Sequence, residues 1–219
     1  MKKFILLFVL AISFTVYAQE EIKEGTLKMK VTMSSENPQI NSSLAVMGDI
    51  TASSSFKGEK SRTEMSSPMM GNNTTIVDNT DKTVLVLMDN PMAGKKFMKQ
   101  EIKDDDEALK DITVKENGET RNILGYECKG YDVTMMNNGI DTKMTLYVTD
   151  KIKAYNQNSL ALGDKIKGFP LLSVVKATQN GMPITTTAEV IELKKGDIDD
   201  ALFDMTIPEG YTELKMPGK

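Results

Sequence analysis

Residues 171–193 read LLSVVKATQNGMPITTTAEVIEL, which is two β-prone runs on either side of an Asn-Gly pair. The first run covers Leu171–Thr178 and the second covers Ile184–Leu193, with Asn180-Gly181 between them. Asn-Gly is the strongest short-range signal for a β-hairpin, because both residues of its tight turn must accept a positive φ angle. This stretch therefore predicts two long antiparallel strands and indicates a fold built from hairpins.

The same signal occurs upstream, where Cys128–Met136 and Ile140–Thr149 meet at Asn138-Gly139. Near the start of the chain, Leu27–Met33 alternates apolar and polar residues, as expected of a strand with one buried and one solvated face. The further strands that we expect are Leu44–Phe56, Ser61–Met65, Thr74–Val77, Thr83–Leu87, Lys96–Gln100 and Phe203–Ile207.

Turn residues and polar runs separate the expected strands. Residues 34–42, which include Asn37-Pro38, predict a polar break, and Ser66–Asn73 predicts a long loop. No linker rich in proline, glycine or serine divides the chain, and no internal repeat is present. We therefore expect residues 19–219 to form a single domain, a mostly β (α+β) fold with a curved antiparallel sheet.

Two or three short helices should accompany the sheet. Asp104–Lys110 and Ala154–Leu162 suit one or two helical turns each, and acidic residues favour the first turn of a helix. Near the end of the chain, Asp197 is a candidate cap for a helical turn that reaches Leu202.

The first eighteen residues have the pattern of a secretory signal peptide. Lys2 and Lys3 precede an apolar run from Phe4 to Ile12, which is too short to cross a bilayer. Small residues near Ala18 predict cleavage after that residue. Gln19 follows in place of a cysteine, so we expect no lipid anchor and no transmembrane helix in the mature chain. The protein should be periplasmic or secreted.

Composition narrows the chemistry further. The chain has no histidine, which excludes Ser-His-Asp and Cys-His catalysis and the commonest zinc and copper sites. No glycine-rich phosphate loop is present, so we expect no cofactor and no enzymatic activity. Without the leader, 25 basic and 31 acidic side chains remain, a formal charge of −6 that does not favour nucleic acid.

Cys128 is the sole cysteine, so no disulfide can form within the chain. The position of Cys128 at the start of an expected strand fits a small buried side chain, and the alternative is a reactive or intermolecularly paired thiol.

Sixteen methionines, fifteen of them beyond the initiator, form an unusual load. Met29, Met33 and Met144 alternate with polar neighbours, as in a strand core. Nine others fall at expected loops or strand ends: Met65, Met69, Met70, Met88, Met92, Met98, Met135, Met136 and Met182. Three interpretations remain open: flexible filling of the core, an adaptable apolar binding surface, or thioether ligation of Cu(I) without Met-x-Met repeats.

The segment Asn122–Val133, NILGYECKGYDV, resembles one that recurs in a domain-of-unknown-function family, number 4412, of secreted proteins from Bacteroidetes-type bacteria. Further similar stretches are Lys57–Arg62, Ile76–Asp78 with Asp81-Lys82, Leu146–Asp150, Gly168–Leu171 and Ile207–Tyr211. The resemblance implies the architecture of periplasmic lipoprotein carriers and sensors, an open half-barrel with helices on its concave side. It supplies no catalytic residues. The arginine with which the carriers latch their helix has no counterpart in a matching motif, since only Arg62 and Arg121 are present.

The sequence thus predicts a non-enzymatic, soluble envelope protein that binds a lipid, acyl chain or lipoprotein in an apolar half-barrel groove. The expected lining residues are Leu27, Met29, Val31, Leu85, Leu87, Met144 and Leu146. The alternatives are a structural or interaction module that binds another envelope protein through a sheet edge or the methionine-rich loops and, less favoured, a Cu(I)-binding protein.

Overall fold

We describe the fold from a computed structural model of the chain. The residues that it describes are 20–48, 50–67, 71–101, 112–137, 140–155, 162, 165–179 and 181–214. The expected leader, residues 1–18, lies outside them.

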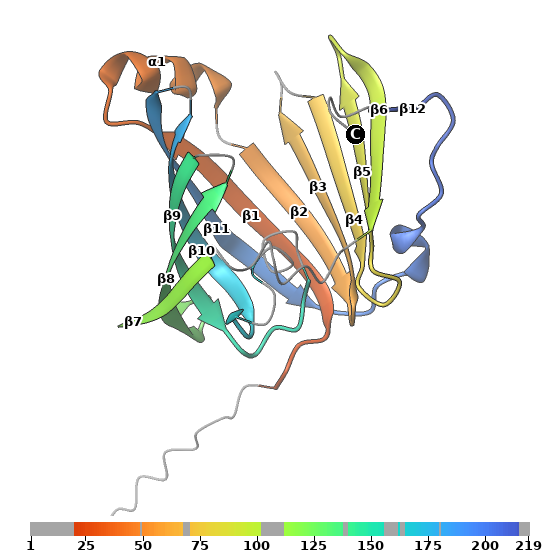
Figure 1. Cartoon of the computed structure of the whole chain (residues 1–219). Coiled ribbons are helices and arrows are strands. Elements are labelled where there is room, and N and C mark those ends of the chain that lie inside the picture. Colours follow the sequence, from red (N-terminus) through yellow and green to blue (C-terminus); the bar gives the residue numbers. More distant parts are fainter. Residues whose placement is uncertain are drawn as a thin grey trace, which may run out of the picture.

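One large antiparallel sheet makes up most of the molecule, and it curls without closing (Figure 1). The strands of its first half are β1 (Glu24–Ser34), β2 (Ile50–Lys57), β3 (Lys60–Ser67), β4 (Gly71–Asp78), β5 (Thr83–Asn90) and β6 (Gly94–Glu101). Those of its second half are β7 (Ile112–Ile123), β8 (Tyr126–Asn137), β9 (Ile140–Thr149), β10 (Phe169–Gln179) and β11 (Met182–Lys195). The short strand β12 (Thr212–Glu213) lies at the edge of the first half, beside β6. The strand order is β12-β6-β5-β4-β3-β2-β1-β11-β10-β9-β8-β7, and only β12 pairs in parallel, with β6.

Both Asn-Gly hairpins are confirmed. Gln179 pairs with Met182, which leaves a two-residue turn in which Gly181 has a φ of +77°. Asn137 likewise pairs with Ile140. Hairpin pairing holds these strands together, and the pairing of β1 with β11 joins the two halves of the sheet.

The predicted polar break at residues 34–42 is wrong, because most of it belongs to the helix α1 (Pro38–Met47). Oδ1 of Asn37 accepts a hydrogen bond from the backbone N–H of Gln39 at 2.9 Å, and Pro38 takes the first helical position, where it costs no hydrogen bond. The strand predicted from Leu44 consequently begins at Ile50. Figure 1 shows α1 at one end of the curled sheet.

The prediction of two or three helices on the concave side is also wrong for the described part of the chain, in which α1 is the one complete α-helix and is joined by one complete 3₁₀ turn. The turn is η2 (Asp200–Phe203), and its cap is Asp199, whose Oδ1 accepts from the N–H of Ala201 at 3.0 Å. Residues 204–207 form no strand, in contrast to the prediction. The expected helix at 104–110, and most of the one at 154–162, lie outside the described residues.

Strand β7 has no counterpart among the predicted elements. It pairs with β8 through a turn in which Leu124 and Gly125 have φ angles of +53° and +86°. Most of its side chains are exposed, so no apolar alternation marks it. The register between β7 and β8 shifts between Glu116 and Thr120, which interrupts the free edge of the sheet with a bulge.

The register divides the sheet into two faces, because directly opposed residues of neighbouring strands point to the same side. One cross-strand row in β1 to β6 consists of Met29, Ala52, Met65, Asn73, Met88 and Lys96. We call the side that carries this row the inner face. The opposite side, the outer face, carries charged rows such as Lys28, Ser53, Glu64, Thr74, Leu87 and Phe97.

The C-terminal segment, residues 196–214, covers the outer face of β3 to β5, and Figure 1 shows it outside the curled sheet. Phe203 is 4% exposed and packs against the cluster of Ile76, Leu85 and Leu87. Arg62 adds a hydrogen bond of 3.3 Å from its guanidinium to the carbonyl of Leu202. The two leucines are thus core residues between the sheet and this segment.

Two other clusters of buried side chains complete the core. The larger gathers around Phe56 and Phe169, and Ile22 joins it from the N-terminal segment. The backbone of Ile22 donates to the carbonyl of Lys151 at 2.7 Å and accepts from the N–H of Lys153 at 2.8 Å, which fixes the start of the described chain to the sheet. The third cluster surrounds Val133 and Leu146 on the inner face of β8 and β9.

Candidate functional site

The methionines are sorted by face. Nine lie in the described strands, and eight of these belong to the inner face: Met29, Met33, Met65, Met88, Met98, Met135, Met144 and Met182. Met136 points to the outer face and is 58% exposed. Several of these residues, including Met65 and Met88, were expected at loops or strand ends but lie within paired strands. The inner face is therefore lined with long, flexible apolar side chains.

A pocket of about 360 Å³ opens on the inner face at one end of β3 to β6. The row of Met65, Asn73, Met88 and Lys96 crosses its floor. The row nearer the strand ends contains Ser67, Gly71, Asn90 and Gly94. The remaining lining residues are Asn72, Ala93 and Leu214.

Small residues create this hollow. Gly71 has a φ of +74°, and a Cβ atom there would lie 2.1 Å from the carbonyl oxygen of Asp89, so only glycine fits. Gly94, with a φ of +75°, begins β6 on the other side of Asn90. Because neither glycine fills the end of the sheet, the space above Met65 and Met88 stays open.

The polar groups of the pocket differ in how they are satisfied. Oδ1 of Asn90 accepts from the backbone N–H groups of Met92 and Ala93 at 2.8 and 3.0 Å, which fixes the β5–β6 turn. The ammonium of Lys96 donates to the hydroxyl of Thr212 at 2.9 Å. Ser67 is 4% exposed, and its Oγ is the one buried side-chain polar atom of the described chain without a hydrogen-bond partner.

Apolar side chains occur in the lining of the pocket and in the turn next to it. Met92, in the β5–β6 turn beside Ala93, is 95% exposed, which is unusual for a large apolar side chain. Leu214 follows β12, and its backbone N–H donates to the carbonyl of Phe97 at 2.8 Å. The C-terminal segment thus crosses from the outer face to the edge of the sheet and ends as a wall of the pocket.

The expected lining residues are divided between the two faces. Five of the seven point inward, namely Leu27, Met29, Val31, Met144 and Leu146. Leu27 and Leu146 are only 1% and 2% exposed. Leu85 and Leu87 lie on the outer face, below Phe203. None of the seven lines the pocket described above.

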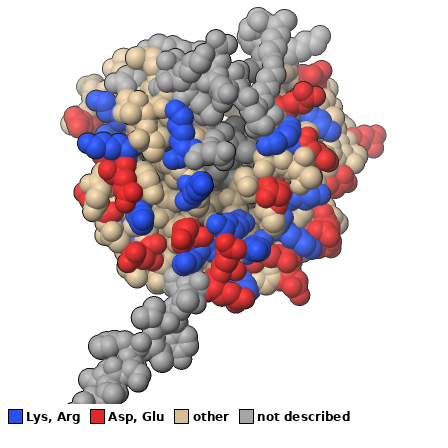
Figure 2. Space-filling model, turned by 60° about the horizontal axis from the view of Figure 1, so that its bottom comes forward, with Lys and Arg blue, Asp and Glu red and all other residues tan. Residues whose placement is uncertain are grey.

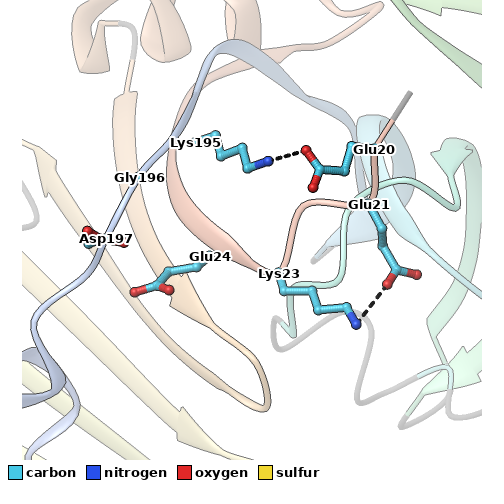
Figure 3. A pocket seen from close by; sticks show the side chains of 7 residues that line it. All are labelled: Glu20, Glu21, Lys23, Glu24, Lys195, Gly196 and Asp197. Carbon is cyan, nitrogen blue, oxygen red and sulfur yellow. Dashed lines mark hydrogen bonds and ion pairs between the residues drawn. The ribbon is translucent and has the colours of Figure 1, made fainter. Parts of the chain in front are cut away.

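A second hollow, of about 430 Å³, lies between the N-terminal segment and the chain that follows β11 (Figure 3). Its lining is almost entirely charged: Glu20, Glu21, Lys23, Glu24, Lys195, Gly196 and Asp197. Figure 3 shows Lys195 bonded to Glu20, and Lys23 bonded to Glu21 at 3.2 Å.

Glu24, in the same hollow, accepts from the backbone N–H of Ile198 at 2.6 Å. Lys57 lies 3.5 Å from Glu24 and 3.0 Å from Asp200, so this group ties the start of β1 and the segment after β11 to the end of β2. Figure 2 shows charges of both signs interspersed over this side of the molecule. We interpret the second hollow as a structural junction.

Cys128 lies on β8 and is fully buried and free. Burial raises the pKa of its thiol to about 11, so the reactive thiolate is scarce at neutral pH. On the neighbouring strand Tyr147 is also buried, and its hydroxyl donates to the carboxylate of Glu119, a contact that raises the pKa of the phenol. The guanidinium of Arg121 lies 4.1 Å from the centre of the Tyr147 ring. Cys128 and Tyr147 belong to the buried cluster around Phe56 and Phe169, so the thiol occupies a core position.

Within the described residues, no group of three or more cysteine, aspartate or glutamate side chains is placed to hold a metal ion. In the same residues, no helix has the length and apolar character needed to cross a membrane.

The fold and the pocket define a class of protein, an antiparallel β protein with one open, curled sheet. The profile of the family described as domain of unknown function DUF4412 matches residues 23–211, and the chain belongs to that family.

No curated protein matches this chain. A solved structure of PNGF-II in the C2 space group is similar to it, with 19% sequence identity and a TM-score of 0.47. The similarity covers 87% of this chain but 31% of PNGF-II, so the chain spans less than a third of that protein's length.

Proposed function

We propose that this protein is a non-enzymatic, exported binding protein that holds a hydrophobic ligand, a lipid or an acyl chain, on the inner face of its sheet. The observation that carries the proposal is the pocket at Met65 and Met88, on a face to which eight of the nine described strand methionines point. Its volume falls within the range of roughly 300–1,000 Å³ that is common for small-molecule sites.

Burial of an apolar ligand there would supply the binding energy without directional contacts. Each Å² of apolar surface removed from water contributes about 25 cal/mol. Unbranched thioether side chains such as Met65 and Met88 change rotamer easily and repack around ligands of different shape.

Export is the second part of the proposal, and it rests on the leader pattern of residues 1–18. Gln19 after the expected cleavage site supports release of the mature chain without a lipid anchor. The folded part begins shortly after this site, since Ile22 is already buried against the sheet.

Association with another envelope protein along the free edge of the sheet has less support. The free strand β7 carries a bulge and the charged side chains of Lys115, Glu116 and Glu119, which are features that protect an edge against pairing.

The binding of an uncharged, environment-sensitive dye tests the proposal. We expect saturable binding of N-phenyl-1-naphthylamine to the purified chain and its displacement by single-chain lipids. Met65→Asp places a charge on the pocket floor between Ala52 and Asn73 and should reduce the affinity for the dye at least tenfold, because an unpaired charge in an apolar site costs several kcal/mol. Met136→Asp, on the exposed outer face, is the matched control and should bind like the parent chain. Absence of saturable dye binding, or equal loss in both variants, would contradict the proposal.

A further inference from the structure

We infer that one end of the curled sheet docks on a lipid surface, with exposed methionines of three hairpins in contact with the lipid. The inference goes beyond the proposed function, which concerns the pocket alone. Two features carry it: the two ends of the sheet differ in charge, and the end that is poor in charge is also the end at which the pocket lies.

The strand pairing defines the two ends. At one end, which we call the methionine end, lie α1 and the paired strand ends Ser67 with Gly71, Asn90 with Gly94, Asn137 with Ile140 and Gln179 with Met182. At the other, which we call the charged end, Lys57 pairs with Lys60, Asp78 with Thr83 and Ile123 with Tyr126. Ser34, just before α1, pairs with Thr185 of β11, which sets the two halves of the sheet side by side in this sense. Figure 1 shows α1 and the β5–β6 turn at the upper side of the molecule, the methionine end.

The sequences at the two ends differ in charge. Although 26% of the chain is charged, the stretches that connect the strands at the methionine end contain no Asp, Glu, Lys or Arg in their sequence; they are residues 37–48, 66–73, 90–94, 135–140 and 177–188. The turns of the charged end contain both signs: Lys57, Glu59, Lys60, Asp78, Asp81 and Lys82. Figure 2 looks at this end and shows the charges spread over it. Because a charge moved from water into lipid costs several kcal/mol, the methionine end is the one suited to lipid.

Three hairpins present exposed methionines at the methionine end. Met92, in the β5–β6 turn, is 95% exposed, Met136 near the end of β8 is 58% exposed, and Met182 at the start of β11 is 40% exposed. They stand on separate hairpins and not in one contiguous patch. A protein partner would need a complementary surface with a total buried area above about 1,000 Å². A fluid lipid layer accommodates single flexible side chains, so this arrangement favours lipid.

The pocket connects this surface to the proposed function. Asn90, Ala93 and Gly94 of the β5–β6 turn belong to the pocket lining, and Met92 lies in the same turn. Oδ1 of Asn90 holds the turn by accepting from the N–H groups of Met92 and Ala93 at 2.8 and 3.0 Å. Contact of Met92 with lipid would therefore bring the pocket to the lipid, and an apolar ligand would enter with little exposure to water.

Single-tryptophan reporters test the inference. The chain has no tryptophan, so Met92→Trp and Leu124→Trp each introduce one fluorophore into the full chain. Leu124 is the matched control, because it is an apolar residue that is 44% exposed in the β7–β8 turn at the charged end. With phosphatidylcholine vesicles, the Met92→Trp emission should shift to shorter wavelength and be quenched by brominated acyl chains, whereas the Leu124→Trp emission should stay unchanged.

The control also detects attachment through the leader. Ile22 is bonded to the backbone of Lys151 and Lys153, which follow β9 at the charged end. A chain held on vesicles by its first eighteen residues would therefore bring the Leu124 reporter, not the Met92 reporter, towards the lipid.

A second change in the Met92→Trp chain measures the other methionines. Met136→Asp should raise the vesicle concentration for the half-maximal shift about tenfold, because one apolar contact is lost and a charge is placed at the lipid. Leu124→Asp, at the charged end, should leave that concentration unchanged. Addition of phosphatidylglycerol to the vesicles should not strengthen the binding, since the stretches at the methionine end contain no lysine or arginine.

The outcomes separate the inference from the proposed function. An unchanged Met92→Trp emission, equal shifts of both reporters, or tighter binding to anionic vesicles would overturn the inference. A shift that appears without vesicles as the protein concentration rises would assign the methionine end to a second copy of the chain, which also overturns it. Each of these results leaves the proposed function intact as long as N-phenyl-1-naphthylamine binds. Failure of the dye to bind, with a normal response of the Met92 reporter, would overturn the proposed function alone.

Discussion

The two faces of the same sheet follow opposite chemical rules. On the outer face, charged side chains pair with their neighbours, as in Lys28 with Glu192 at 3.2 Å, and Phe203 covers the apolar residues. On the inner face, methionines replace ion pairs, and the hydroxyl of Ser67 has no partner among the described residues. The buried clusters around Phe56, Val133 and Phe203 stabilise the fold from both faces, whereas the open, methionine-lined end of the inner face is where our proposal places binding.

Removal of the Phe203 ring, which covers part of the outer face, should have the largest effect on the free energy of unfolding. Phe203→Ala deletes a ring that is 4% exposed and packs on the cluster of Leu85 and Leu87. We expect a loss of about 3–5 kcal/mol in the free energy of unfolding, measured by urea denaturation. Leu202→Ala, at the neighbouring position that is 37% exposed, is the control and should cost far less. Similar losses in the two variants would show that the segment is not part of the core.

A buried carboxylate on the outer face should have the next largest effect. Burial of Asp78 opposes ionisation, but the N–H groups of Asp81 and Thr80 and the ammonium of Lys60 outweigh it, so its pKa lies below the ordinary value. Asp78→Ala leaves both N–H groups without this acceptor and should cost about 2 kcal/mol in the free energy of unfolding.

The same group makes a prediction about pH. Because the pKa of Asp78 is lowered by folding, its contribution is complete above the ordinary carboxyl pKa of 3.8 and is lost as the pH falls through the lower value of the folded state. The stability gap between the parent and Asp78→Ala should therefore narrow in urea titrations below that pH. A constant gap, or an equal one for the exposed Asp81→Ala, would contradict this account.

An inner-face truncation should cost less. Met88 is only partly buried and faces the open pocket, so Met88→Ala should lower the free energy of unfolding by about 1 kcal/mol, well below the usual cost in a closed core. The same variant should weaken the binding of N-phenyl-1-naphthylamine. A loss as large as that of Phe203→Ala would indicate that the two faces are packed alike.

The smallest effect concerns Cys128. With full burial and a thiol pKa of about 11, the native chain should not react with a thiol reagent such as Ellman's reagent at pH 8 within an hour, and it should react with one equivalent in urea. Fast modification of the folded chain would show that the buried cluster around this thiol opens readily.

The hairpins were predictable because the Asn-Gly turns and the alternation around them are local signals. Strand β7 was not, because its edge position leaves its side chains exposed and its turn uses Leu124 and Gly125 in place of Asn-Gly. Helix α1 was missed because its local signals have two meanings. Asn37 and Pro38 are typical of both a turn and a helix start, and the surrounding polar residues favoured the turn.

Which residues of a strand point to the inner face and which to the outer face was predictable only where one face is exposed to solvent. Residues Val84–Leu87 are apolar without interruption, because the C-terminal segment covers one side of β5 and the inner face lies on the other. A strand with both sides covered does not reveal in its sequence which residue faces which side. The pocket itself depends on the register that aligns Met65 with Met88 across β4, which no local pattern specifies.

The most direct test of the central claim is a titration of the chain with dodecanoate, followed by NMR of the chain labelled with ¹³C at its methionine methyl groups. Binding on the inner face predicts saturable shifts of the Met65 and Met88 methyl signals at the same ligand concentration, with the Met136 signal unchanged. Unchanged Met65 and Met88 signals, or shifts that Met136 shares equally, would contradict the assignment of binding to the inner face.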